Sequence, residues 1–281
     1  MRTQGVSEFR QNADATDLLV EEIREFGYTV LPGVLDADEL AEAREHIDAV
    51  YDRQVEEFGG VERLELINDA DIARCPLEYD DYFVEMAANP AVREVVERLL
   101  GDYFVLHAQN GIINRPRDDQ YFQHAWHRDI QYRHLTTSRP LGISALYCID
   151  EFSAATGCTR MLPASHRSEA FPSPEFIERH AVLAEAEAGS VLLFDSMIYH
   201  RAGENSSGKT RRAVNQIFTL PLIQQQISLP DALGGRFADD PRLRRLLGYE
   251  APPGTSTLDW RNRKLQAAGV SEAYSGTPNK S

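Results

Sequence analysis

The sequence predicts a mainly β fold with flanking helices, built around a double-stranded β-helix, a cupin-like jelly roll. Amphipathic stretches of helical period come first, and after Gly101 they give way to short apolar runs of strand length separated by turn residues. No linker or repeat of fixed period divides the chain. We therefore expect a single domain over 1–281, with a helical part at 15–101, a jelly-roll core at about 103–223 and an irregular C-terminal segment at 224–281.

The first two elements are predicted to be a helix and a strand. Apolar residues recur at helical spacing over 17–26, Asp14 or Thr16 can cap this helix, and Gly27 can end it. Residues 28–35 are apolar and β-branched and contain a Pro-Gly pair, which predicts a strand that ends in a turn.

Two more helices are predicted, over about 36–58 and 89–101. The second of these has Pro90 in its first turn and Gly101 after its end, which is the usual asymmetry of helix termini. The longer helix ends at a Gly-Gly pair and places one apolar stripe on a single face: Leu40, Ala43, Ile47, Val50 and Tyr51.

The strands of the core are predicted from apolar runs that turn residues separate. The six runs are Tyr103–His107, Tyr121–Ile130, Leu141–Ile149, Thr159–Pro163, Ser190–Phe194 and Ala213–Leu220. The last thirty or so residues are rich in Pro, Gly, Ser and Arg, which predicts an irregular tail.

The composition excludes several classes of partner. The chain carries 44 acidic and 29 basic residues, for a formal charge of −15, and no long basic run, so we expect neither nucleic acid nor an anionic membrane as a partner. Three irregularly spaced cysteines form neither a disulfide framework nor a zinc ribbon. Without a signal peptide or a run of eighteen apolar residues, a cytoplasmic protein that acts on a small molecule is expected. The oligomeric state does not follow from the sequence.

A candidate metal site is formed by His127, Asp129 and His200. On a strand, residues two apart point to one face, so His127 and Asp129 would converge on one point. His200, about 70 residues downstream at the end of an apolar strand, can complete the set. Two imidazoles and a carboxylate leave three positions of an octahedral Fe(II) open, enough for a bidentate 2-oxo acid and O2. A structural zinc site would use a fourth protein ligand.

A candidate site for the co-substrate follows His200. The far carboxylate of 2-oxoglutarate needs a guanidinium fork, and both Arg211 and Arg212 are available. Strand alternation places Arg211 with Ala213 and Asn215 on one face, and Arg212 on a more apolar face with Val214, Gln216 and Phe218. The more apolar face should pack against the helices, which favours Arg211 as the inward residue.

These residues resemble the phytanoyl-CoA dioxygenase family of Fe(II)/2-oxoglutarate oxygenases. The resemblance is carried by WHRD at 126–129, TRMLPASH at 159–166, and the H-x4-N-x5-R pattern from His200 through Asn205 to Arg211. GYTVLPGVL at 27–35 and the INRP segment at 113–116 also look like this family.

The resemblance implies a jelly-roll core and iron held by the HxD pair and the distal histidine, with Arg211 on the co-substrate. It also implies that Asn114 and Ser144 contact 2-oxoglutarate. In one respect the chain departs from the pattern: several members have a serine two residues after the distal histidine, where this chain has Ala202.

Candidate substrate residues are less specific. Gln131 and Arg133 follow the metal pair and could reach a substrate beside the iron, although a solvated loop explains them equally well, and Asn110 is a similar case.

The expected activity is hydroxylation, or another oxidation, of an unactivated C–H of a small-molecule metabolite, with release of succinate and CO2. Desaturation or cyclisation by the same site and a non-catalytic jelly roll that binds a ligand are the alternatives. A halogenase is disfavoured because Asp129 fills the halide position, and a zinc hydrolase because no general base is evident.

Overall fold

The computed structural model describes residues 13–116, 122–131, 135–250 and 254–269. The three predicted N-terminal helices are confirmed as α1 (Ala15–Phe26), α2 (Ala37–Phe58) and α5 (Pro90–Leu100). Their ends follow the local capping chemistry. The side chains of Asp14 and Asp36 accept hydrogen bonds from backbone N–H groups of the first turn, and the carboxylate three residues further on accepts from the backbone N–H of the cap residue. Of the two caps proposed for α1, Asp14 is therefore the one used.

Several short elements are additional to those predicted. Apart from α8, they span three to seven residues, so little sequence periodicity identifies them. The α-helices among them are α3 (Val61–Leu66), α4 (Tyr82–Ala87), α6 (Pro174–His180), α7 (Leu229–Ala232) and α8 (Thr257–Ala267), and the 3-10 helices are η1 (Pro76–Glu78), η2 (Phe122–His124) and η3 (Ser165–Arg167). Since α7 and α8 fall within 224–281, that segment is less irregular than expected.

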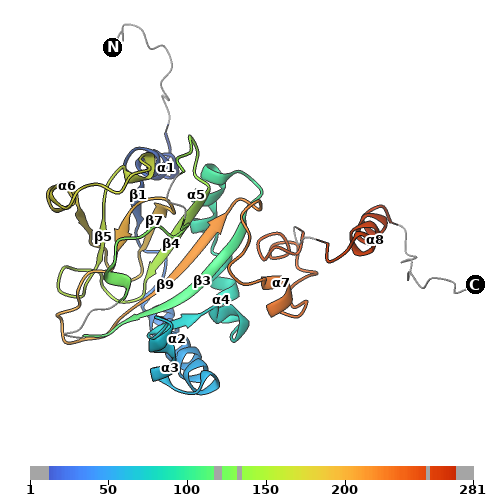
Figure 1. Cartoon of the computed structure of the whole chain (residues 1–281), viewed down its shortest axis with the longest axis horizontal. Coiled ribbons are helices and arrows are strands. Elements are labelled where there is room, and N and C mark those ends of the chain that lie inside the picture. Colours follow the sequence, from blue (N-terminus) through green and yellow to red (C-terminus); the bar gives the residue numbers. More distant parts are fainter. Residues whose placement is uncertain (1–12, 117–121, 132–134, 251–253, 270–281) are drawn as a thin grey trace, which may run out of the picture.

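Two antiparallel sheets form the centre of the molecule (Figure 1). The larger has the order β1-β7-β4-β9-β3-β2, with bounds Tyr28–Leu31, Val191–Asp195, Gly142–Cys148, Arg211–Thr219, Val105–Asn114 and Ile72–Arg74. The smaller has the order β6-β5-β8, with bounds Val182–Ala184, Thr159–Met161 and His200–Arg201.

Five of the six predicted strands of the core lie at the expected places, although β3 runs seven residues beyond its expected end, from His107 to Asn114. The strand expected at 121–130 is wrong. Residue 121 lies outside the described residues, η2 follows it, and His127 makes a single isolated bridge to His200. Local apolar content predicted a strand here, but the backbone pairs at only one position.

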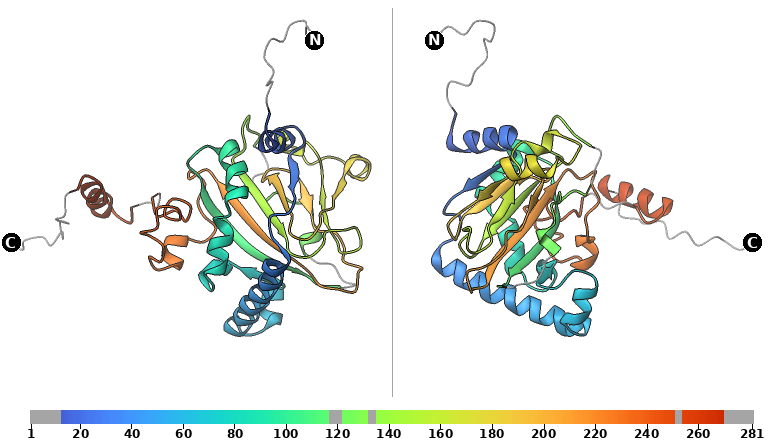
Figure 2. Two further views of the ribbon diagram at one scale, coloured as in Figure 1. Left: turned by 180° about the vertical axis from the view of Figure 1, so that it is seen from behind. Right: turned by 60° about the vertical axis from the view of Figure 1, so that its left-hand side comes forward.

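Helices cover one face of the larger sheet (Figure 2). The apolar stripe predicted on α2 is buried in full, and it packs in one core with residues of α1, α4, α5 and the helix-facing side of β3, β4, β7 and β9. The C-terminal segment contributes to this core through Leu229, Leu233, Leu243, Leu246 and Leu247.

The opposite face of the larger sheet looks toward the smaller sheet. A second apolar cluster joins them, with Leu146 and Leu192 from the larger sheet and Met161 and Ala184 from the smaller. Among the described residues, no helix is both long enough and apolar enough to cross a membrane.

Candidate active site

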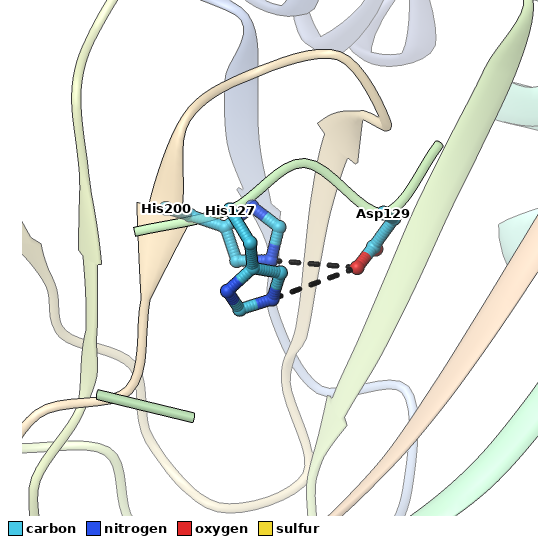
Figure 3. Close-up of side chains that lie close together, drawn as sticks. All are labelled: His127, Asp129 and His200. Carbon is cyan, nitrogen blue, oxygen red and sulfur yellow. Dashed lines mark ion pairs between the residues drawn. The ribbon is translucent and has the colours of Figure 1, made fainter. Parts of the chain in front are cut away.

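His127, Asp129 and His200 converge on one point (Figure 3). One ligand atom from each lies within 4.8 Å of the others. The Asp129 Oδ1 atom is 3.5 Å from His200 Nε2 and 4.0 Å from His127 Nε2. The two imidazole rings are inclined at 56° with centroids 4.3 Å apart. The prediction that these three side chains meet is therefore confirmed.

Backbone pairing brings the distant segments together. His127 and His200 exchange two backbone hydrogen bonds, of 2.9 and 3.0 Å, and the backbone N–H of Asp129 donates to the Ser196 carbonyl at 3.1 Å. The segment around His127 thus lies along β8 without forming a regular strand. The two-residue spacing still directs His127 and Asp129 to the same side.

Each histidine is held in the tautomer that a metal needs. The Nδ1 atom of His127 is 2.8 Å from the Ala125 carbonyl oxygen, and that of His200 is 3.1 Å from the Ile198 carbonyl oxygen. A carbonyl oxygen only accepts, so Nδ1 carries the proton in both rings. The lone pair of each Nε2 is then left for a metal ion, and both Nε2 atoms face Asp129.

Asp129 is anchored through the oxygen that faces away from the histidines. Its Oδ2 accepts a 2.6 Å hydrogen bond from the Ser144 hydroxyl and a 3.4 Å bond from the Asn215 amide. Ser144 is in turn 2.9 Å from the Ser196 hydroxyl. These contacts orient the carboxylate so that Oδ1 points toward the imidazoles.

The electrostatics favour an ionised Asp129. Burial by itself raises the pKa of Asp129. The His200 and His127 imidazoles and the Ser144 hydroxyl lower it by more than burial raises it, so the pKa lies below its usual value. Burial and the neighbouring His200 lower the pKa of His127. Burial also lowers the pKa of His200, yet the Asp129 carboxylate outweighs it and raises the pKa.

The donor set fits ferrous iron. Two neutral imidazoles and one carboxylate are the 2-His-1-carboxylate arrangement that non-haem Fe(II) oxygenases use, and it leaves ligand positions open. Among the described residues, these three make up the group of His, Cys, Asp and Glu side chains close enough to share a metal ion.

The two candidate arginines point in opposite directions, as strand alternation predicts. Arg211 is 2% exposed, and its guanidinium carbon lies 4.3 Å from the centre of the Phe152 ring. Arg212 faces α2, where its Nε and Nη2 atoms donate to the Asp48 carboxylate at 2.8 and 2.7 Å. Of these two arginines, Arg211 is the one that lines the cavity containing the metal site.

This cavity has a volume of about 220 Å³ and lies between the two sheets. The three candidate ligands and Arg211 line it together with Leu146, Phe194 and Ala202. Ala202 supplies no hydroxyl at the position where several members of the resembled family carry a serine. Strands β2 and β3 contribute six further wall residues: Ile72, Arg74, His107, Ala108, Asn110 and Ile112.

The remaining predicted site residues are distributed as follows. Asn114 is the cross-strand neighbour of Arg211, and its amide donates to the Gly203 carbonyl at 3.3 Å. Asn110 and Gln131 both line the cavity. Arg133 lies outside the described residues.

Three side chains near the site were not singled out from the sequence. Asn215 binds Asp129, and its position four residues after Arg211 on the same strand face was the available signal. Arg128, 4% exposed, holds the segment between the two metal ligands by donating to the Ser165 carbonyl at 3.1 Å and stacking on Tyr199. His107 lines the cavity, and no local pattern marked it.

Comparisons of the whole sequence identify one protein family. A model of the phytanoyl-CoA dioxygenase family matches residues 23–213. An uncharacterized protein of Mycobacterium tuberculosis, Rv1501, is 33% identical over 245 residues, which is 85% of this chain and 89% of the relative. The iron/alpha-ketoglutarate-dependent dioxygenase ausU of Aspergillus calidoustus is 30% identical over 149 residues, which is 50% of this chain and 48% of the relative.

Solved structures share the fold. The epimerase SnoN, in complex with Fe3+, alpha ketoglutarate and nogalamycin RO, is 20% identical with a TM-score of 0.59, and the match covers 80% of this chain and 92% of SnoN. The non-heme monooxygenase ThoJ is 19% identical with a TM-score of 0.61, covering 75% of this chain and 80% of ThoJ. The chain therefore belongs to the phytanoyl-CoA dioxygenase family and is a 2-oxoglutarate-dependent non-haem iron dioxygenase.

Proposed function

We propose that the protein oxidises an unactivated C–H bond of a small-molecule metabolite, in the first place by hydroxylation, and releases succinate and CO2. In this proposal His127, Asp129 and His200 hold Fe(II), and Arg211 holds the far carboxylate of 2-oxoglutarate. The single observation that carries it is that three convergent donor atoms and a buried arginine line one cavity of about 220 Å³.

The protein side chains have distinct tasks in this site. When bound, iron with 2-oxoglutarate and O2 supplies the oxidising power. His127 and His200 offer neutral Nε2 atoms because the Ala125 and Ile198 carbonyls fix their tautomers. Asp129 offers a carboxylate oxygen that Ser144 orients from behind.

Arg211 suits the role of anion holder. A guanidinium can grip a carboxylate with two parallel charge-assisted hydrogen bonds, and these bonds are strong where water is scarce. Burial of Arg211 against the Phe152 ring fixes the plane of the fork. In the same proposal Asn114 and Ser144 also touch the co-substrate, and Gln131 and Asn110 face the substrate.

The fold proposed for this function is one jelly-roll domain. Its two walls are the larger sheet and the smaller sheet, and the bridge between His127 and His200 extends the smaller sheet by one position. A barrel of this kind keeps bulk water away from the metal while its open end admits the substrate.

A second outcome of the oxidation is supported by one similar structure. SnoN is an epimerase of nogalamycin biosynthesis, so this fold also hosts oxidations that do not end in hydroxylation. Desaturation, ring formation or epimerisation are therefore the alternatives for this chain. The mass of the product relative to the substrate separates hydroxylation, epimerisation and the loss of two hydrogens, and the NMR spectrum of the product separates a double bond from a new ring.

The activity is tested by succinate formation from 2-oxoglutarate. Purified protein with Fe(II), ascorbate and O2 should form succinate, and a panel of metabolites should stimulate it. His200→Ala should abolish the signal, whereas His180→Ala, at an exposed position on α6, should leave it unchanged. Absence of Fe(II)-dependent succinate from the wild type across the panel would instead indicate a non-catalytic binding protein.

A further inference from the structure

A β-bulge interrupts β3 beside the metal site. Leu106 pairs with Phe218 and Ala108 pairs with Ile217, so His107 is an extra residue with no partner on β9. A bulge of this kind re-aims side chains and is frequent next to active sites. Here it brings two consecutive residues, His107 and Ala108, to the wall of one cavity, while Leu106 packs in the core on the helix side.

The His107 ring has one nitrogen without a partner. Its Nδ1 is buried and has no hydrogen bond to any part of the chain that the structure describes. Burial lowers the pKa of His107, an effect that the nearby Gln224 backbone and the Asp129 carboxylate partly oppose, so the neutral form of the ring is favoured at pH 7. A neutral imidazole has one nitrogen that carries the proton and one that accepts, so a ring with its proton on Nε2 offers Nδ1 as an acceptor.

The C-terminal segment holds the bulge in place. The backbone N–H of Gln226 donates to the His107 carbonyl at 3.1 Å, and the Gln225 amide donates to the Leu106 carbonyl at 2.8 Å. These bonds satisfy backbone carbonyls that the bulge removes from the sheet. Gln226 also lines the cavity, so this segment forms part of the wall next to His107.

A hydrogen-bond donor lies on the same strand. The Nη1 atom of Arg74 donates to Asn110 Oδ1 at 3.1 Å, which fixes the orientation of the amide and leaves its Nδ2 as a donor. Arg74 and Asn110 are cross-strand partners on β2 and β3, and both line the cavity. Between and beside these polar groups the wall is apolar, from Ile72, Ala108, Ile112 and Ile217.

We infer that His107 and Asn110 are the substrate-positioning residues, and that the substrate is a small molecule with at least two oxygen functions, one of them a hydroxyl. The hydroxyl donates to His107 Nδ1, and a second oxygen accepts from Asn110 Nδ2. The isoleucines contact the carbon skeleton. The inference rests on the proposed function, because it places these contacts in the cavity that holds the metal ligands.

The experiment uses small cyclic diols and hydroxy ketones, each matched with the methyl ether that lacks the O–H donor. Binding is measured as the concentration dependence of the melting temperature of the full chain loaded with redox-inert Mn(II) and 2-oxoglutarate. The wild type should bind members of the hydroxyl series about 3- to 10-fold more tightly than their ethers, as one hydrogen bond implies. His107→Phe should abolish this preference, and His107→Asn, which keeps an acceptor, should retain it.

Controls separate a local effect from a general one. His180→Phe, the same change at an exposed histidine, should leave the preference intact. Equal binding of alcohols and ethers by the wild type, no binding in either series, or an unchanged preference in His107→Phe would each overturn the inference. Fe(II)-dependent succinate formation is measured separately, so failure of the catalytic proposal is distinguishable from failure of the substrate assignment.

Discussion

Replacement of Arg211 by Ala should weaken 2-oxoglutarate binding severely. Arg211 is 2% exposed, so the co-substrate carboxylate that it is proposed to hold would be left desolvated without a counter-charge. Removing one partner of a buried, hydrogen-bonded charge pair costs about 2–5 kcal/mol. At about 1.4 kcal/mol for each factor of ten, the KM for 2-oxoglutarate should rise by roughly 30-fold to several thousand-fold.

Two matched variants test the geometry of this assignment. Arg211→Lys keeps the charge and loses the planar fork, so its KM should fall between those of the wild type and Arg211→Ala. Arg212→Ala removes the contact with Asp48 on α2, which is partly exposed. Its effect should be on stability, at most about 1 kcal/mol, with the KM unchanged.

The assay is succinate formation at saturating Fe(II) over a range of 2-oxoglutarate concentrations, with unfolding curves for each variant. The expected order of KM is Arg211→Ala above Arg211→Lys above Arg212→Ala. If Arg212→Ala raised the KM more than Arg211→Ala did, the inward direction of Arg211 would not explain co-substrate binding.

Three further predictions concern Ser144, Asp195 and Gln216. Ser144→Ala removes the 2.6 Å hydrogen bond to Asp129, so it should lower metal affinity about 10- to 100-fold in a Mn(II) titration. If metal affinity were unchanged and the KM for 2-oxoglutarate rose, the hydroxyl would contact the co-substrate instead. Burial raises the pKa of Asp195 from 3.8 to about 6. The Asp195 carboxyl therefore binds its proton more tightly in the native state than in the unfolded state, and its ionisation lowers stability as the pH rises through this range. Asp195→Asn should therefore gain up to about 3 kcal/mol relative to wild type between pH 4 and pH 7.5 in urea unfolding, and a gain that is the same at both pH values would contradict this cause. Gln216 is fully buried, and neither its amide oxygen nor its amide nitrogen has a hydrogen-bond partner among the described residues. Gln216→Leu should therefore raise the free energy of unfolding by about 1–2 kcal/mol. A lower free energy of unfolding would show that the amide is hydrogen-bonded.

Elements with local signals could be predicted from the sequence. The start of α2 follows from the cap Asp36, its end from the glycine at 59, and its buried stripe from the apolar spacing, all of which act within a few residues. Arg211 could be separated from Arg212 because side chains alternate on a strand and only one face of β9 meets the helices.

Features that depend on distant pairing could not be predicted in this way. The segment before Asp129 has the apolar content of a strand, yet its described residues form a single sheet bridge, with the two-residue strand β8. The bulge at His107 arises from the register between β3 and β9 and from the bonds that Gln225 and Gln226 supply. Likewise, the bond from Ser144 to Asp129 depends on how β4 lies against the metal segment, and no residue near Ser144 in sequence reveals it.

The residues that hold the bulge at His107 in place lie outside the part of the chain that matches the family. The family match ends at residue 213, while the stretch that braces His107 and supplies Gln226 to the cavity wall begins at 224. This stretch contains none of the candidate iron ligands and does not include Arg211. Substitutions in this stretch can therefore reshape one wall of the pocket without changing any candidate iron ligand or Arg211.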